Sequence, residues 1–134
     1  MHCRLNPADM CLSCYSKQLG GEQRFTYDQT GLGRFHREYQ AMMDHWRKKL
    51  SANCLIEVGY ATVADDLEGQ AKRLIDFIDL PWDAACQNFH KTQHVARTVS
   101  VNQARKSIYR TAKGRWRIHA VQLGPLLTAL AIKP

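Results

Sequence analysis

The feature that most constrains the fold is a long amphipathic run between residues 32 and 50. Its apolar side chains recur at steps of three and four residues: Leu32, Phe35, Tyr39, Met42, Met43, Trp46 and Leu50. This spacing places them on one face of an α-helix, while charged residues such as Arg34 and Glu38 fill the other faces. We interpret the apolar stripe as core packing, because a stripe of this kind is far more often core than a cofactor site.

A second helix is expected before this run. Asn6-Pro7 predicts its start, with Asn6 as the N-cap and the proline in the first turn. The helix is expected to continue to about Leu19 and to end at Gly20-Gly21. Residues 22–30 are predicted to form a polar loop. Gly31-Leu32-Gly33 is expected to open the next helix, and without a lysine or a preceding strand it is interpreted as a turn rather than a phosphate loop.

A strand and three shorter helices are expected after residue 50. The apolar run Cys54–Val58 has the length of a buried strand. Asp65-Asp66 then precedes a helix from about Leu67 to Ile78, with its acidic residues in the first turn, where the helix dipole favours them. Leu80-Pro81-Trp82 is predicted to end this helix and to begin a short one that ends near Phe89. A last helix is expected from about Val121 to Ala131.

The alternation of strands and helices predicts an α/β fold that is helix-rich and has a small parallel sheet. The first residues His2–Leu5, too few to assign alone, and Cys54–Val58 would make two short strands. A stable sheet usually needs three or more, which suggests that part of the fold is missing. The length of 134 residues suits one small domain, so residues 1–134 are expected to form a single domain. With no long apolar run and no apolar signal-peptide core, we expect no membrane span.

Charge and cysteine content restrict the function classes. The net charge of +7, from 19 basic and 12 acidic residues, favours an anionic partner or simply a solvated basic surface. Five irregularly spaced cysteines argue against a disulfide framework and predict a reducing, cytoplasmic compartment. Cys11 and Cys14 form a C-x-x-C pair, but no second pair completes a zinc site, so we interpret them as small hydrophobic thiols on a helix.

Three segments in order carry a family resemblance. They are CRLNPADMCLSCY (3–15), LIEVGYATVADDLEGQAKRLIDFIDLPWD (55–83) and RTVSVNQARKSIYRTAKGRWR (97–117). Together they resemble the sulfotransferase family, and especially the bacterial branch related to tyrosylprotein sulfotransferases. This family uses 3′-phosphoadenosine 5′-phosphosulfate (PAPS) as its sulfuryl donor. The resemblance implies the C-terminal half of a sulfotransferase domain, with a partial P-loop-NTPase-like fold.

The resemblance also implies a binding site for PAPS or for its product, adenosine 3′,5′-bisphosphate (PAP). The residues it assigns to this site are Arg4, Ser13, Lys17, Tyr60, Ser100, Arg110 and Arg115. Ser13 corresponds to the hydroxyl ligand of the 3′-phosphate, and Lys17 would add charge one helical turn later. The other readings are a mid-helix serine bonded to a carbonyl and a solvated lysine.

The remaining assignments follow the same resemblance. Tyr60 would contact the adenosine end of the nucleotide, or alternatively be a packed core aromatic. Ser100, Arg110 and Arg115 would contact adenine or phosphate, or alternatively belong to a solvated basic tail. Trp116 is interpreted as a packing anchor.

The sequence departs from the family pattern at two places. The family arginine stands eight residues before the serine, where this chain has Leu5, with Arg4 as its neighbour. Adjacent side chains of a strand point to opposite faces, so Arg4 and Leu5 are not equivalent. Ala61-Thr62 replaces the family's Glu-Asp after Tyr60.

The chain has no Gly-x-x-x-x-Gly-Lys-Ser/Thr phosphate loop and no assignable catalytic base. We therefore expect a truncated sulfotransferase-family protein, with weak or no transfer of sulfuryl to a hydroxyl-bearing small molecule or peptide by the chain alone. The expected partner is a complementing chain or a second copy of this chain. Two alternatives are a basic module that binds nucleic acid through residues 97–117 and an interaction protein with a decayed nucleotide site.

Overall fold

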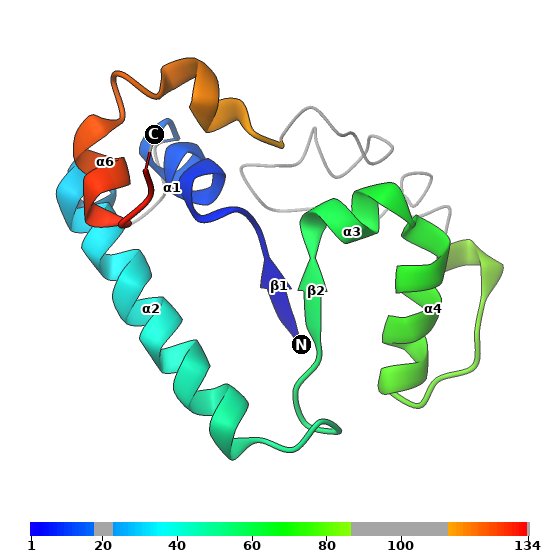
Figure 1. Ribbon diagram of the computed structural model, residues 1–134. Helices are drawn as coiled ribbons and strands as arrows, with labels where there is room; N and C mark the ends of the chain where they lie inside the picture. Colours follow the sequence, from blue (N-terminus) through cyan, green and yellow to red (C-terminus); the bar gives the residue numbers. More distant parts are fainter. Residues whose placement is uncertain (18–22, 87–112, 134) are drawn as a thin grey trace. The chain divides into compact units, whose positions relative to one another are not determined.

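The structure is a computed structural model that describes residues 1–17, 23–86 and 113–133 (Figure 1). In chain order its elements, with η for short 3₁₀ helices, are β1 (His2–Arg4), α1 (Pro7–Tyr15), η1 (Arg24–Tyr27), α2 (Gln29–Lys49), β2 (Glu57–Gly59), α3 (Tyr60–Asp65), α4 (Leu67–Phe77), η3 (Arg115–His119) and α6 (Gly124–Ala129). They form two compact units, each described here by itself. The sheet unit comprises the described residues of 1–4 and 52–110, and the helical unit those of 5–51 and 111–134.

The sheet unit contains the expected parallel sheet. β1 and β2 pair in parallel, with His2 opposite Glu57 and Arg4 opposite Gly59. The strand predicted at Cys54–Val58 therefore begins three residues later, at Glu57, and only Ile56 and Val58 of this run are buried. The helix-rich α/β architecture with a small parallel sheet is confirmed.

Two helices follow β2 in the sheet unit. The predicted helix is confirmed as α4, and the Asp66 carboxylate caps it by accepting a hydrogen bond from the Gly69 amide at 2.9 Å. Helix α3, which begins directly after β2, was not predicted as a separate element. Asp79 adopts a positive φ of 57° just after α4, which ends that helix before Leu80. A short 3₁₀ turn spans residues 84–86, and Phe89 lies outside the described residues.

The helical unit begins with α1, whose predicted start is confirmed. The Asn6 Oδ1 accepts hydrogen bonds from the amides of Ala8 and Asp9, at 3.0 and 3.3 Å. The predicted end at Leu19 is wrong, because α1 ends at Tyr15 with Ser16 as its C-cap. No glycine directly follows Tyr15, so the sequence carries no signal that α1 ends at this residue.

The long helix α2 is confirmed, and it begins earlier than its apolar pattern indicated. The Asp28 side chain caps it by accepting a hydrogen bond from the Gly31 amide. Gly31-Leu32-Gly33 lies at the opening of this helix, as expected, but its residues form the first turns of α2 rather than a separate turn. The polar loop predicted over residues 22–30 is also wrong where the structure describes it, because it contains η1 and the start of α2.

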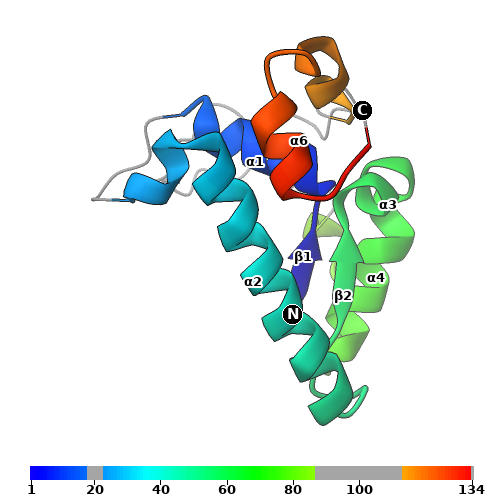
Figure 2. The same cartoon turned by 60° about the vertical axis from the view of Figure 1, so that its left-hand side comes forward.

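The core of the helical unit joins α1, α2, η3 and α6. Its buried members are Ala8, Cys11, Leu32, Trp116, Leu123, Leu126, Leu127 and Leu130. Figure 2 shows α6 lying against the first half of α2. The burial of Cys11 and Trp116 confirms their interpretation as packing residues. Helix α6 is shorter than the predicted 121–131, and η3 was not predicted.

Most of the apolar stripe of α2 lies outside this core, so its interpretation as core packing holds only at its start. Leu32 is buried, whereas Phe35, Met42, Trp46 and Leu50 are 52%, 52%, 43% and 39% exposed. The reason is length: α2 has 21 residues, whereas α1 has nine and α6 has six. At about 1.5 Å per residue, neither short helix reaches the far end of α2.

None of the helices in the described parts of the chain combines the length and the hydropathy needed to cross a membrane.

Candidate functional site

Ser13 lies in the last turn of α1 and is half-buried. Its carbonyl oxygen accepts a 3.4 Å hydrogen bond from the Ser16 hydroxyl. The amides of Ala8 and Asp9 at the helix start already donate to Asn6. An anion next to Ser13 would therefore be bound by side chains rather than by these N-terminal amides.

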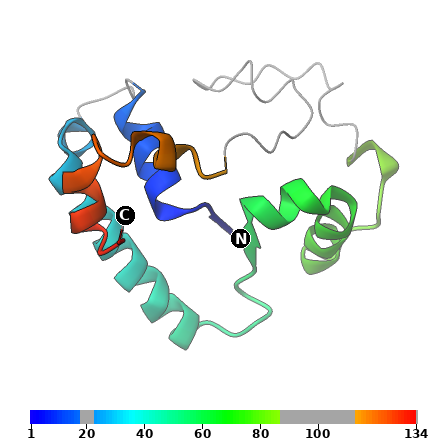
Figure 3. The same cartoon turned by 45° about the horizontal axis from the view of Figure 1, so that its top comes forward.

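A buried carboxylate connects α1 to a distant part of the chain. Asp9 is 5% exposed, and its two oxygens accept hydrogen bonds from the backbone amides of Gly114 (2.7 Å) and Trp116 (3.0 Å). Charge-assisted hydrogen bonds of this kind are about twice as strong as neutral ones. Asp9 therefore fixes the turn at residues 114–116 against α1, as Figure 3 shows for the orange segment beside that helix.

This turn contains Arg115, between the two amides that Asp9 binds. Gly114 has φ = 79°, a conformation that favours glycine, and it caps the start of η3. The Trp116 ring is buried in the core, and the Arg117 guanidinium lies 5.1 Å from its centroid. The backbone of Arg115 is thus fixed on both sides, while its side chain is exposed.

Asp9, which binds residues 114 and 116, lies one turn of α1 before Ser13. Asp9 and Ser13 are four residues apart, so they lie on the same face of α1. Ser13 and Arg115 are far apart in the sequence, yet the structure places their elements in contact within one unit. Ser13 and Arg115 therefore lie on elements that contact each other.

Lys17 lies beyond the end of α1, so it does not extend the face of Ser13 as predicted. Its amide donates to the Cys14 carbonyl at 3.4 Å, and its side chain is half-buried. Burial raises the pKa of the Cys14 thiol, and the positive charge of Lys17 partly opposes that shift. The lysine charge therefore lies close to the C-terminal end of α1.

Arg4 and Tyr60 lie in the sheet unit. Arg4 shares a face of β1 with His2, and both contact the Glu57 carboxylate. The distances to its oxygens are 2.7 Å from His2 Nδ1 and 3.5 Å from Arg4 Nη1. Arg4 is therefore paired with a carboxylate, although its side chain is 59% exposed. Tyr60 is half-buried at the start of α3.

Two predicted site residues, Ser100 and Arg110, lie outside the described residues, as does the basic stretch before Lys113. Asp9 was missed by sequence reasoning, although it ends the stretch Asn6-Pro7-Ala8-Asp9 of the first resembling segment. Its place in that segment was the signal that could have identified it. In the parts of the chain that the structure describes, no group of three His, Cys, Asp or Glu side chains is placed to hold a metal ion.

Comparison with known proteins gives one family and one relative. Residues 2–84 match the Sulfotransferase family. The first two resembling segments lie inside this match, and the third lies beyond it. An uncharacterized protein of Aquifex aeolicus (strain VF5) is 29% identical over 133 residues, covering 97% of this chain and 17% of that protein. The chain thus spans about a sixth of the length of this curated relative. No solved structure matches this chain.

Proposed function

Because the chain belongs to the sulfotransferase family, we propose that its helical unit binds PAPS or PAP through Ser13 and Arg115. The observation that carries this proposal is the pair of hydrogen bonds by which Asp9 holds the Arg115 turn against the helix of Ser13. A rigid backbone at Arg115 lowers the entropy lost when its side chain binds an anion.

The chemistry of the two side chains suits a phosphate group. The Ser13 hydroxyl can donate one hydrogen bond, and the Arg115 guanidinium can donate two in parallel to phosphate oxygens. The net charge of +7 favours the approach of a nucleotide that carries several negative charges. We assign the 3′-phosphate to this pair because the family resemblance gives Ser13 as its hydroxyl ligand and Arg115 as a phosphate contact.

The proposal extends to the remaining residues of the family pattern. By the same resemblance, Lys17 would add charge near the phosphates. The resemblance also proposes Arg4, Tyr60, Ser100 and Arg110 as nucleotide ligands. The three segments also lead us to assign the chain to the bacterial branch related to tyrosylprotein sulfotransferases. In this proposal residues 1–134 are the C-terminal half of one sulfotransferase domain.

The test is a calorimetric titration of the purified chain with PAP. We expect wild-type binding, with a loss of about tenfold or more in affinity for Ser13→Ala and for Arg115→Ala. Arg34→Ala is the matched control, because it removes the same charge from an exposed position on α2 and should change the affinity little. Equal affinities for all four proteins, or no binding at all, would refute the proposal.

We further propose that this chain binds the nucleotide but does not catalyse sulfuryl transfer from it. Transfer to a hydroxyl acceptor needs a base for the acceptor and a group that stabilises the leaving phosphate. The sequence has no phosphate-loop motif that would hold the 5′-phosphosulfate. An assay with PAPS and phenolic or peptide acceptors should give no turnover, and robust turnover by the purified chain would contradict this proposal.

A further inference from the structure

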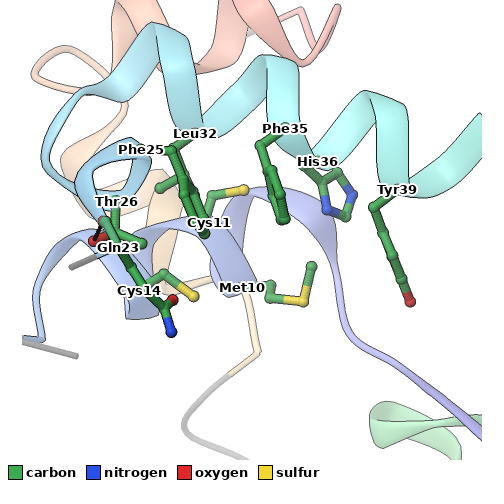
Figure 4. A pocket seen from close by; sticks show the side chains of 10 residues that line it. All are labelled: Met10, Cys11, Cys14, Gln23, Phe25, Thr26, Leu32, Phe35, His36 and Tyr39. Carbon is green, nitrogen blue, oxygen red and sulfur yellow. Dashed lines mark hydrogen bonds between the residues drawn. The ribbon is translucent and has the colours of Figure 1, made fainter. Parts of the chain in front are cut away.

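Two pockets of this chain differ in the chemistry of their walls. One opens between α1, η1 and α2 (Figure 4), and no lysine, arginine, aspartate or glutamate is among the described residues that line it. The other lies in the sheet unit and has a volume of about 380 Å³, within the range of roughly 300–1,000 Å³ found for small-molecule sites. This second pocket, called here the α4 pocket, is lined by Lys72, Arg73, Ile75, Asp76, Leu80 and Trp82.

The turn after α4 builds one wall of the α4 pocket, and local hydrogen bonds fix it. Asp79, with its φ of 57°, ends the helix in the left-handed conformation. Its amide donates to the Asp76 carbonyl at 3.0 Å, and the Leu80 amide donates to the Ile75 carbonyl at 3.2 Å. These two hydrogen bonds form a Schellman motif. The chain then runs back beside α4 (Figure 1), so this wall is in place before any ligand binds.

Within the described residues, two opposite charges in the α4 pocket lack an ion pair. The Arg73 guanidinium donates to two neutral oxygens, those of the Gln70 side chain and the Glu57 carbonyl, each at 3.0 Å. The ion pairs in the described parts of the chain include neither Arg73 nor the Asp76 carboxylate. These two residues are three positions apart in α4, so they are neighbours on its surface. The pocket thus presents one positive and one negative charge side by side.

This pair of charges matches a zwitterion. A free α-amino acid has a carboxylate, which a guanidinium can bind through two parallel hydrogen bonds, and an ammonium group, which a carboxylate can accept. An ion of a single sign would face the like charge of either Arg73 or Asp76. The terminal residue of a peptide carries only one of the two charges. The negative end of the α4 dipole, near Asp76, also favours the ammonium group.

The remaining wall of the α4 pocket is apolar. Ile75 and Leu80 supply aliphatic surface beside Trp82. The Lys72 Nζ already lies 5.5 Å from the centroid of the Trp82 ring, a cation–π distance that leaves less of this ring for stacking by a ligand. We propose that the α4 pocket binds a free α-amino acid with a branched aliphatic side chain, whose carboxylate pairs with Arg73 and whose ammonium group pairs with Asp76.

The test compares L-leucine with two analogues that each lack one charge. The analogue 4-methylpentanoate lacks the ammonium group, and 3-methylbutylamine lacks the carboxylate. An NMR titration of the full chain, followed at the indole N–H of Trp82, gives the three affinities. We expect L-leucine to bind about fivefold more tightly than either analogue, the upper end for one exposed charge pair.

Variants separate the two charges. Asp76→Asn should reduce the preference over 4-methylpentanoate to about onefold and keep the preference over 3-methylbutylamine, and Arg73→Gln should do the reverse. Asp79→Asn is the matched control. It removes the same charge from an exposed aspartate that does not line the pocket, and asparagine tolerates this φ, so both preferences should persist.

The comparison of the three ligands on the wild-type chain does not depend on how the variants fold. Equal affinities for L-leucine and either analogue in the wild type, or no binding of L-leucine, would overturn the proposal. So would an Asp76→Asn variant that folds and keeps its preference for L-leucine over 4-methylpentanoate.

Discussion

The smallest feature with a large structural effect is the Asp9 carboxylate. It is buried, and it joins α1 to Gly114 and Trp116, which lie 105 and 107 residues later in the chain. Its partners are backbone amides, so the two hydrogen bonds use no side-chain atom of residue 114 or 116. Removing this carboxylate would leave two amides without an acceptor inside the unit.

Replacing Asp9 tests this role. In Asp9→Asn one side-chain oxygen still accepts a hydrogen bond, but the new NH₂ group faces an amide that also donates. We expect a loss of about 1–3 kcal/mol in the free energy of unfolding, measured by urea denaturation. Asp44→Asn on exposed α2 is the control and should change stability by less than about 0.5 kcal/mol. Equal stabilities of the two variants would show that Asp9 does not fix the turn.

At the level of single residues, the cysteines should also differ in how fast they react. Burial raises the pKa of Cys11 to about 12, with a smaller contribution from Cys14. Because the thiolate is the reactive form, Cys11 should be the slowest to react in the folded chain. Cys3 and Cys54 are exposed and should react first. Timed alkylation at pH 8 with mass-spectrometric mapping checks this order, and early labelling of Cys11 would contradict it.

Among the elements, the contact between α2 and α6 depends on a glycine. A Cβ atom placed on Gly33 would lie 2.6 Å from the Cβ of Ala129 and 3.3 Å from the Leu126 carbonyl oxygen. The two helices can approach this closely only because position 33 has no side chain. Gly33 therefore reflects helix packing rather than a turn.

Gly33→Ala should separate these helices. We expect a loss of about 1–3 kcal/mol in unfolding free energy from overpacking. Gly124→Ala is the matched control, since a Cβ there has no atom within 4 Å, and it should be neutral or stabilise slightly. Thermal and urea unfolding measure both. A Gly33→Ala variant as stable as the control would mean that the helices pack less closely than described.

The sequence predicted the elements unevenly, for physical reasons. Helix α2 was predictable because its apolar spacing repeats over many turns. Helices α1 and α4 were predictable because Asn6 and Asp66 cap their starts. The 3₁₀ helices η1 and η3 are too short to show a period. Periodicity also identified the apolar face of α2 without revealing how much of it is covered, so Trp46 was wrongly assigned to the core.

At the scale of the whole molecule, family membership explains the candidate site better than composition does. The charge of +7 fitted a nucleotide as well as a nucleic acid, and only the ordered segments pointed to Ser13 and Arg115. No local pattern predicted that Asp9 would join their elements, because the contact spans most of the chain.

The most direct test of the account compares PAP with 5′-AMP, which lacks the 3′-phosphate, by calorimetry on the wild type and on Asp9→Asn. If the Asp9-held turn and the helix of Ser13 bind that phosphate, the wild type should prefer PAP by about tenfold or more, as hydrogen bonds to a charged group predict. Folded Asp9→Asn should lose most of this preference. Equal affinities for the two nucleotides in the wild type, or a preference unchanged in Asp9→Asn, would contradict the account.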